Sequence, residues 1–283
     1  MSDSIFGEYG IWRRRPDLVP GFATEVERLG FGTLWIGGSP GEDLAPLELA
    51  LSETSSMVVG SSVVNIWTAA AEPTAATFRR LDETYPGRVF LGIGSGHREA
   101  TPQRTKPLDA YREYLDALDA SGVGQDKRML AALGDRALEI ARDRTRGSIP
   151  YFTSPEHTRH ARSILGPDAL LAVEQGVTVT ADVDEARAIA RRAVKDSYLK
   201  MVNYVSILHR FGFDESDTAD GGSDRLIDTM IRHGSAPEIA AALGDHRDAG
   251  ADHVAIQILA DGGDVLKPMA ALAQALGLHP LAN

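Results

Sequence analysis

Cysteine is absent from the 283-residue sequence. Its absence excludes disulfide bonds, thiolate metal ligands and a cysteine nucleophile, and it leaves the redox compartment undecided. Basic side chains are also fewer than acidic ones. The sequence has 29 lysines and arginines and 40 aspartates and glutamates, which gives a formal net charge of −11. An acidic surface repels nucleic acids and anionic membranes, so we expect neither as a partner.

Long hydrophobic runs are equally absent. The most apolar stretches, such as residues 63–71, are too short and too polar to cross a bilayer, which requires about 20 apolar residues. The first residues lack the basic and apolar segments of a secretory signal. With 24% charged and 43% hydrophobic residues, the composition is that of a globular protein. We therefore expect a soluble, cytoplasmic protein whose partner is a small molecule.

What is present is a regular alternation of strand and helix patterns. Runs rich in branched and aromatic residues predict eight strands, at 6–12, 33–36, 57–67, 88–93, 128–133, 148–152, 170–180 and 253–259. Amphipathic stretches predict helices at 16–29, 44–55, 73–84, 108–120, 135–145, 154–165, 182–210, 235–250 and 265–276.

Polar residues mark the starts of several predicted helices. Ser154 stands where an N-cap is expected. Asp182 with Glu185, and Ser235 with Glu238, have the spacing of capping boxes.

Eight strands alternating with helices predict an α/β fold, a single (β/α)8 TIM barrel formed by residues 1–283. A doubly wound open sheet is the alternative, and the count of eight strands favours the barrel. Segment 211–234, between the last two predicted strands, is expected to be a surface insertion with a helix at 224–233. Active sites of such barrels form at the C-terminal ends of the strands. Those ends are Trp12, 37–39, 65–67, 94–97, 134–135, 151–153 and Gln257.

The most informative segment is the glycine-rich turn at 88–97. Gly92, Gly94 and Gly96 alternate, which lets another backbone or a flat ligand approach a strand end. The spacing differs from the dinucleotide-binding fingerprint, and a sharp strand exit without a ligand would look the same. His97 ends the turn and titrates near neutral pH, so it is either a proton donor or a hydrogen-bonded loop residue.

Together, these motifs resemble those of a known family. The order of 60–67, Glu72-Pro73-Thr74 and Pro86–His97 resembles the bacterial luciferase-like family, whose flavin and deazaflavin members share a P-x-R-x-x-L-G-x-G-x-G turn. Further segments resemble one actinobacterial subfamily of coenzyme F420-dependent oxidoreductases and extend the resemblance over nearly the whole chain. They are 111–115, 130–134, 155–158, 203–204, 222–226 and 249–254.

The resemblance implies where a coenzyme ring would lie. In this family the ring rests on a bulge in the third strand that holds a non-prolyl cis peptide, and the matching pair here is Ser62-Val63. Where related enzymes often have an Asp-His pair, this chain has only backbone amides and one hydroxyl, at Gly37, Gly38 and Ser39. The remaining residues implied around the ring are Asn65, Gly94, Ser95 and Gly96.

The resemblance also implies sites for the coenzyme phosphate and the proton donor. The phosphate is expected at Gly134, Asp135 and Arg136, where a glycine turn opens a helix and offers unpaired N–H groups, although Asp135 could equally cap that helix. His97 stands where a sugar-phosphate-converting relative has a glutamate, which argues against that substrate and makes His97 the first candidate for proton transfer. The acidic coenzyme tail would need cations such as Arg13–Arg15, although such a run could also be a solvated loop.

Other residues have weaker claims to a function. His157 and His160 share a helix face, but no third ligand is evident, so we expect no metal site. Trp12 and Trp67 could wall an aromatic pocket, whereas Trp35 is expected in the core.

Three functions remain open from the sequence. The first is an F420-dependent oxidoreductase that transfers a hydride to or from an enone or carbonyl compound. The second is a luciferase-like monooxygenase that uses reduced FMN. The third is a barrel that binds the coenzyme without catalysis. Relatives in this family are often homodimers, and the sequence leaves the oligomeric state open. The 283 residues are few for this family, which predicts a reduced lid and an open pocket.

Overall fold

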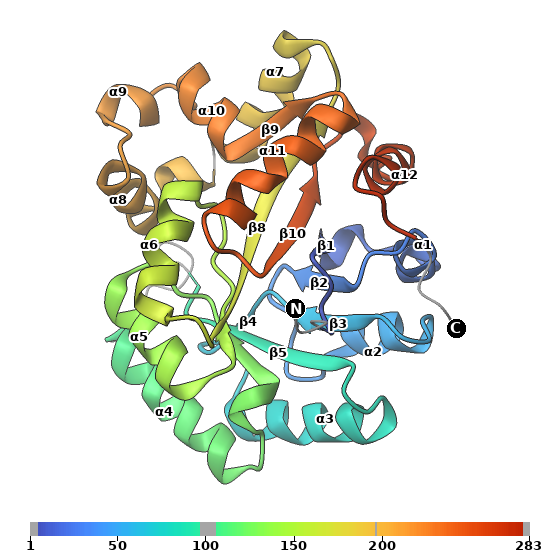
Figure 1. Cartoon of the computed structure of the whole chain (residues 1–283). Coiled ribbons are helices and arrows are strands. Elements are labelled where there is room, and N and C mark those ends of the chain that lie inside the picture. The colour runs from blue at the N-terminus through green and yellow to red at the C-terminus, as the bar shows by residue number, and fades with distance from the viewer. Residues whose placement is uncertain (1–4, 97–105, 196, 280–283) are drawn as a thin grey trace.

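The computed structural model describes residues 5–96, 106–195 and 197–279. Within these residues, parallel strands form a closed barrel that is surrounded by helices (Figure 1). The strands are β1 (Tyr9–Arg14), β2 (Thr33–Gly37), β3 (Val58–Ser61), β4 (Val64–Asn65), β5 (Val89–Gly94), β6 (Arg128–Leu130), β7 (Gly147–Ser148), β8 (Leu170–Val179), β9 (Ile231–Gly234) and β10 (His253–Ile258). Pairing of β10 with both β8 and β1 closes the barrel. The predicted TIM barrel is confirmed, and the open-sheet alternative is wrong.

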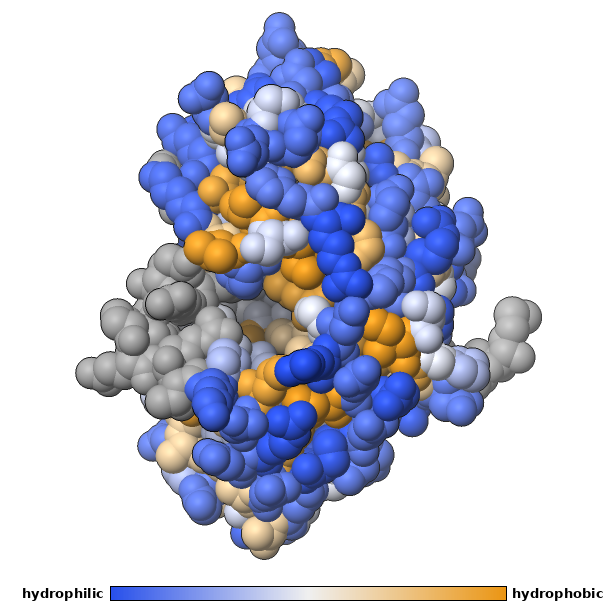
Figure 2. Space-filling view, turned by 90° about the vertical axis from the view of Figure 1, so that its left-hand side faces the viewer, coloured by the Kyte–Doolittle hydropathy of each residue, from blue (hydrophilic) through white to orange (hydrophobic). Residues whose placement is uncertain are grey.

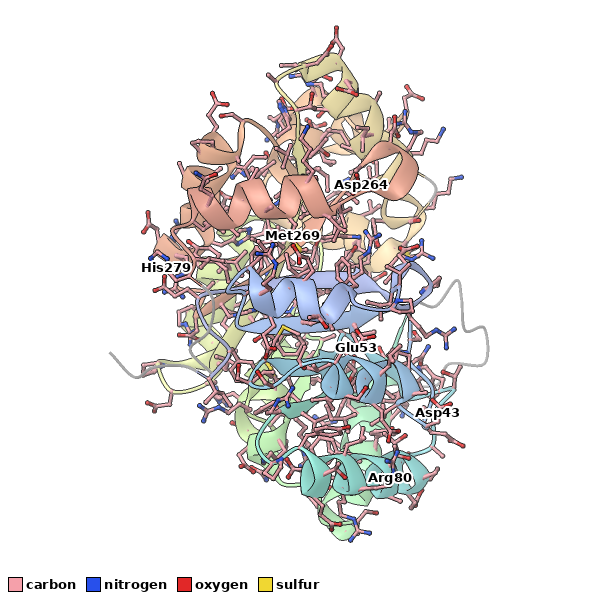
Figure 3. The ribbon with its side chains drawn as sticks, turned by 90° about the vertical axis from the view of Figure 1, so that its right-hand side faces the viewer. Asp43, Glu53, Arg80, Asp264, Met269 and His279 are labelled. Carbon is pink, nitrogen blue, oxygen red and sulfur yellow. The ribbon has the colours of Figure 1, made fainter. Side chains whose placement is uncertain are left out.

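Helices cover the outside of the barrel. They are α1 (Phe22–Arg28), α2 (Ala45–Ser52), α3 (Ala71–Thr84), α4 (Pro107–Ala120), α5 (Asp135–Arg144), α6 (Pro155–Leu165), α7 (Val183–Val194), α8 (Val202–Arg210), α9 (Glu215–Thr218), α10 (Asp224–Met230), α11 (Ala236–Asp248) and α12 (Leu266–Ala275). Figure 3 shows α12, α1, α2 and α3 in successive rows on one side. The rows are joined by Glu53, which accepts the Gly21 N–H at 3.0 Å, and by Arg80, which pairs with Glu48 at 2.6 Å.

The core has two layers because successive strand residues face opposite sides of the sheet. Side chains such as Trp35, Phe90 and Met129 fill the barrel interior. Side chains such as Leu34 and Leu91 pack between the barrel and the helices. Each fully buried side chain of this kind contributes about 1.5–3 kcal/mol. Trp35 lies in the core as expected.

The third predicted strand, 57–67, is not continuous. A cis peptide between Ser62 and Val63 separates β3 from β4, as the family resemblance implies. Both halves pair with β5, so the chain bulges at the C-terminal end of the barrel without leaving it.

The prediction of one long helix at 182–210 is wrong. The chain forms α7, a 3-10 turn at Tyr198–Lys200 and then α8. The Asp182 carboxylate caps α7 by accepting the Glu185 N–H at 3.0 Å, but Glu185 accepts from the Thr180 hydroxyl and does not complete the capping box. By contrast, the capping box of Ser235 and Glu238 is confirmed at the start of α11.

Segment 211–234 is more than a surface insertion. α10 ends at Met230, and residues 231–234 form β9, which pairs in parallel with Gly176–Val179 of β8. β7 pairs only with Leu170 and Leu171, so the rest of that β8 edge needs another partner for its backbone groups. The prediction of a helix to residue 233 and of an exposed segment is therefore wrong, since Leu226, Ile227, Met230 and Ile231 are buried. In the portion of the chain that the structure describes, no helix is both long and apolar enough to cross a membrane.

Candidate active site

A cavity of about 840 Å³ opens at the C-terminal ends of the barrel strands. Figure 2 shows hydrophobic residues around a hollow on this face. Most of the coenzyme-binding residues expected from the sequence line it, namely Gly38, Ser39, Ser62, Val63, Asn65, Gly94, Ser95, Gly96, Gly134, Asp135 and Arg136. Gly37 is not part of the lining, and His97 lies outside the described residues. The strand-end rule therefore brings residues from distant parts of the sequence into one cavity.

The glycines of the 92–96 turn are explained mainly by the bulge beside them. A Cβ on Gly92 would lie 2.0 Å from the Ser61 carbonyl oxygen, and a Cβ on Gly94 would lie 2.3 Å from Cγ2 of Val63. Gly96 has φ +54°, and a Cβ there would lie 2.8 Å from Nδ2 of Asn65. The alternating glycines thus let the neighbouring backbone approach, and this contact places Val63 as a shelf in the cavity.

Trp12 forms a wall of the cavity next to that shelf. Its Nε1–H donates to Oγ of Ser62 at 3.0 Å, and the ring is 5% exposed. The ring lies across Gly37, where a Cβ would be 2.0 Å from ring carbon Cζ2. Gly37 therefore supports the site through Trp12. Trp67, the other tryptophan expected at the pocket, instead donates its Nε1–H to the Ser95 carbonyl at 2.9 Å and is not part of the lining.

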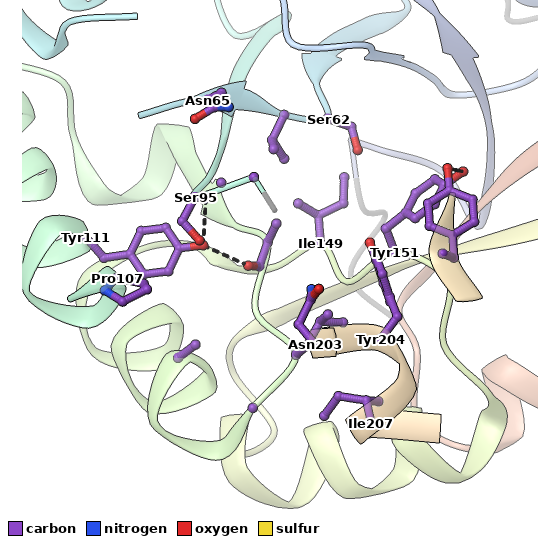
Figure 4. Close-up of a pocket in the computed structure, with 18 of the residues that line it drawn as sticks. Ser62, Asn65, Ser95, Pro107, Tyr111, Ile149, Tyr151, Asn203, Tyr204 and Ile207 are labelled. Atoms are coloured by element: carbon purple, nitrogen blue, oxygen red, sulfur yellow. Dashed lines mark hydrogen bonds between the residues drawn. The ribbon is translucent and has the colours of Figure 1, made fainter. Parts of the chain in front are cut away.

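Tyr111 fixes the turn that follows β5. Its hydroxyl accepts the Ser95 N–H at 2.9 Å and donates to the Ala131 carbonyl at 3.3 Å (Figure 4). One buried hydroxyl therefore joins the ends of β5 and β6, which form adjacent parts of the cavity floor.

The N-terminal end of α5 opens into the cavity at Gly134. This glycine is the N-cap and has no side chain, so the first N–H groups of the helix lack a side-chain cap. Asp135 does not cap the helix, contrary to the alternative considered from the sequence. Its carboxylate accepts two hydrogen bonds from Arg210 at 2.7 and 2.9 Å and lies 2.8 Å from Nε2 of His160. These partners, Arg210 first, hold the pKa of Asp135 far below its usual range.

Of the arginine run at 13–15, only Arg14 lines this cavity. Arg13 lies over the Phe22 ring, 5.5 Å from its centroid, and donates to the Asp17 carbonyl at 3.3 Å. Arg15 begins a 3-10 turn at Arg15–Asp17.

His157 and His160, the histidine pair on α6, contact other protein groups that hold them in place. Nε2 of His157 lies 2.8 Å from the Leu133 carbonyl oxygen, and burial lowers the pKa of this histidine to about 4. His160 contacts Asp135, as described above. No cluster of three or more potential metal ligands occurs within residues 5–96, 106–195 and 197–279.

Two tyrosine hydroxyls lie in the same wall of the cavity as Trp12, whose ring centroid is 5.1 Å from that of Tyr151. Tyr198 donates to the Tyr151 hydroxyl at 2.8 Å, and Tyr151 donates to Oε1 of Gln257 at 2.7 Å. Burial raises the pKa of Tyr198 to about 12 and raises the pKa of Tyr151 well above its ordinary value, so both remain protonated donors at neutral pH.

Glu174 supports this wall from inside the barrel. It is 3% exposed, and its Oε2 accepts the Phe152 N–H at 3.0 Å. Phe152 has φ +54°, a conformation that non-glycine residues seldom adopt, and the buried carboxyl group stabilises it. Burial raises the pKa of Glu174 to about 8. Glu174 thus fixes the turn that orients Tyr151.

Sequence reasoning missed the residues that α8 contributes. Asn203, Tyr204, Ile207 and Arg210 line the cavity and face the shelf across it (Figure 4 shows the first three). The sequence signal at 203–204 consisted only of the family resemblance, and nothing in the local pattern indicates that α8 crosses the cavity mouth.

Taken together, the lining fits a flat ring compound that carries a phosphate. Val63 and Trp12 offer apolar surface for the ring, while the α5 N-terminus and Arg210 offer positive charge at the other end.

Comparison with known proteins supports this description. Residues 10–121 match the family model described as luciferase-like monooxygenase, which confirms the resemblance inferred from the sequence. A protein of Mycobacterium tuberculosis (strain ATCC 25618 / H37Rv) named F420-dependent hydroxymycolic acid dehydrogenase is 33% identical over 115 residues, covering 37% of this chain. The aligned region covers 32% of that protein, so the similarity to this relative extends over about a third of its length.

Solved structures share the fold over almost the full length. An F420-dependent secondary alcohol dehydrogenase in complex with an F420–acetone adduct has a TM-score of 0.74 and 14% identity, with 95% of this chain and 98% of that chain covered. The oxygenating component of 3,6-diketocamphane monooxygenase from Pseudomonas putida, a type II Baeyer–Villiger enzyme in complex with FMN, has a TM-score of 0.67 and 15% identity, with 96% of each chain covered. Because the identities are only 14% and 15%, the similarity to these two structures shows the fold alone.

Proposed function

We propose that this chain is an oxidoreductase that transfers a hydride between coenzyme F420 and a small carbonyl or enone compound, and the match of residues 10–121 to the luciferase-like monooxygenase family model supports this class of function. The observation that carries the proposal is the cavity itself, in which the Ser62-Val63 shelf and the positive end of α5 lie at opposite sides. The names of the M. tuberculosis relative and of the alcohol dehydrogenase structure, both F420-dependent, support this coenzyme.

The chain would hold the coenzyme through three groups of contacts. The ring would lie on Val63, next to Trp12, with Asn65 and the backbone of the 94–96 turn at its edge. Gly38 and Ser39 would meet the ring from β2. The phosphate would lie at the first N–H groups of α5, near Gly134 and Arg136, with Arg210 as the nearby cation.

When bound, the coenzyme would supply or accept the hydride, and the protein would orient the reactants and exclude water. We assign the accompanying proton transfer to His97, on the basis of its place after the glycine turn and of the family resemblance. Arg14 is the member of the 13–15 run that lines the cavity, but it lies at the Trp12 end, whereas the acidic tail would extend from the phosphate at the α5 end, so we do not assign the tail to this run.

An FMN-dependent monooxygenase is the second candidate. One specific observation favours it, namely the FMN complex of a monooxygenase with the same fold. FMN also combines a flat ring with a phosphate, so the shelf and the α5 terminus would suit either molecule.

Titration of the purified protein with coenzyme F420 and with FMN, followed by fluorescence and absorbance, tests the proposal. We expect binding of F420 at low micromolar concentration or tighter and much weaker binding of FMN. Tight FMN binding without F420 binding would contradict the proposal and favour the monooxygenase. F420 binding without turnover of any carbonyl, enone or alcohol would favour a barrel that only binds the coenzyme.

A further inference from the structure

A second cavity, of about 560 Å³, lies beside the first at the same end of the barrel. It is bounded by the ends of β1 and β10 and by α7. None of the residues expected to hold the coenzyme ring or phosphate lines it, although Arg13 and Arg14, considered for the coenzyme tail, do. Its volume is within the range of about 300–1,000 Å³ that is common for small-molecule sites.

The lining of the second cavity is mixed. Ile189, Val194 and Ile258 give it apolar surface, and Gln257 gives it a polar group close to the barrel axis. Arg192 lies at the outer side and is already paired with Asp261. The cavity therefore suits an organic molecule with an apolar body and a small number of polar atoms.

The two cavities share one wall. Trp12, Arg14, Tyr151 and Tyr198 line both of them. Trp12 is fixed in the wall by its hydrogen bond to Ser62. Hydride transfer requires the reacting atoms to be about 3–3.5 Å apart, so a ring in the first cavity and a substrate from the second can react only at this wall.

Besides the Arg14 guanidinium, the polar groups of this wall include two hydroxyls. Tyr198 donates to Tyr151, which donates to Gln257. Tyr198 is therefore the first hydroxyl in this series of hydrogen bonds. Each hydroxyl has a single hydrogen, and both hydrogens are already donated within this series of bonds. To bind a carbonyl oxygen, Tyr198 turns its hydrogen from Tyr151 to the substrate, which exchanges one acceptor for another. Glu174 holds the turn that carries Tyr151, so the position of the pair is set from within the barrel.

From this arrangement we propose that the second cavity is the substrate site, and that the Tyr198 hydroxyl, positioned by Tyr151, binds the oxygen of a carbonyl substrate or of its alcohol product. This inference rests on the proposed hydride transfer. As hydride reaches the carbonyl carbon, the electron pair of the C=O π bond moves onto the oxygen, and donors aimed at that oxygen stabilise it. The proton that completes the alcohol is the one that the proposed function assigns to His97, which lies outside the described residues, so Tyr198 binds and orients the oxygen without changing its own protonation.

The test uses the full chain with reduced coenzyme F420 and a panel of acetone, cyclohexanone and 2-cyclohexenone. For Tyr198→Phe and Tyr151→Phe we expect an unchanged coenzyme Kd and unchanged pH dependence, with kcat/KM lower by about 10- to 100-fold. Tyr114→Phe is the matched control, since Tyr114 is a buried tyrosine that lines neither cavity and donates to the Thr74 hydroxyl at 3.4 Å. Thermal melts confirm that each variant is folded.

A reciprocal pair of variants tests the assignment of the two cavities. Ala193 lines the second cavity and Ala137 lines the first. Ala193→Phe is expected to raise KM for cyclohexanone at least 10-fold without changing the coenzyme Kd, and Ala137→Phe is expected to weaken coenzyme binding instead.

The outcomes separate this inference from the proposed function. Failure of the wild-type protein to bind F420 overturns the proposed function and, with it, this inference. Coenzyme binding without oxidation by any carbonyl in the panel overturns the substrate class alone. Turnover that is unchanged in both tyrosine variants, or a KM unchanged in Ala193→Phe, overturns the placement of the substrate.

Discussion

The guanidinium of Arg210 and the carboxylate of Asp135 form a two-point ion pair across the mouth of the cavity, with N–O distances of 2.7 and 2.9 Å. Asp135 is the first residue of α5, and Arg210 is the last residue of α8. The pair therefore ties the helix that crosses the mouth to the helix whose N-terminus is expected to bind phosphate. It also places the Arg210 guanidinium beside that N-terminus, although the Asp135 carboxylate neutralises its charge.

Replacement of this arginine tests the proposed phosphate site. We expect Arg210→Gln to weaken coenzyme F420 binding by about 10-fold, because a charged hydrogen-bond donor near the phosphate is lost. Fluorescence titration measures the change. Arg142→Gln is the matched control, since Arg142 pairs with its exposed neighbour Asp143 away from the cavity. Equal coenzyme affinity in the two variants would remove Arg210 from the site.

The packing of the glycine turn against the shelf predicts a second effect. Gly94→Ala would place a methyl group 2.3 Å from Cγ2 of Val63, in a region where neither backbone can easily move. We expect a loss of about 1–3 kcal/mol in the free energy of unfolding, together with weaker coenzyme binding.

Gly244→Ala provides the opposite control. Gly244 lies within α11, and a Cβ there would meet no atom within 4 Å. Alanine is expected to stabilise that helix by about 0.5–1 kcal/mol. Chemical denaturation of both variants measures the two changes, and a Gly94→Ala protein as stable as the wild type would show that the turn is not packed as described.

Burial of Glu174 predicts a specific dependence of stability on pH. Its pKa rises from an ordinary value of 4.5 to about 8 on folding, so between these values the folded chain holds a proton that the unfolded chain has lost. The contribution of this group is therefore full below pH 4.5 and declines as pH rises toward 8, by up to about 1.4 kcal/mol per pH unit.

Glu174→Gln should remove that decline. Free energies of unfolding measured from pH 6 to pH 9 are expected to fall more steeply for the wild type than for this variant. Glu139→Gln, which changes an exposed glutamate on α5, is expected to follow the wild type. Parallel curves for all three proteins would contradict the burial of an uncharged carboxyl group at position 174.

His97 carries the proposed proton transfer. We expect His97→Ala to bind the coenzyme as the wild type does and to lower kcat by about 10²–10⁴, with loss of the pH dependence that the histidine causes. Steady-state kinetics over pH 5–9 provide the measurement. Unchanged turnover would remove His97 from this role.

The sequence is sufficient to predict the barrel because local patterns agree with the fold. Strand-like runs alternate with helices, and Ser235 and Glu238 form the capping box that their spacing indicates. β9 is missed because it is only four residues long, with no alternating pattern, and it forms where β8 offers an open edge. Such pairing depends on tertiary structure.

The residues of the candidate site also fall into two groups, those that the sequence predicts and those that it does not. Residues at strand ends, such as Ser62 and Gly134, are placed by their position along a strand or a helix, so the sequence predicts that they meet. Tyr198 and Arg210 reach the cavity only because helix α7 ends at Val194, after which a 3-10 turn and α8 run back across the cavity. Glu174 could have been noticed, because a charged residue interrupts the apolar run of β8.

The central claim is that a hydride passes directly between coenzyme F420 and a carbonyl substrate bound beside it. The most direct measurement is a single turnover of the wild-type protein with reduced F420 deuterated at C5 of the ring and a carbonyl compound in ordinary water, with the alcohol product analysed by mass spectrometry. Direct transfer predicts one deuterium on the carbinol carbon of the product. A product without deuterium at that carbon, or coenzyme oxidation that requires oxygen and yields an oxygenated product, would contradict the account.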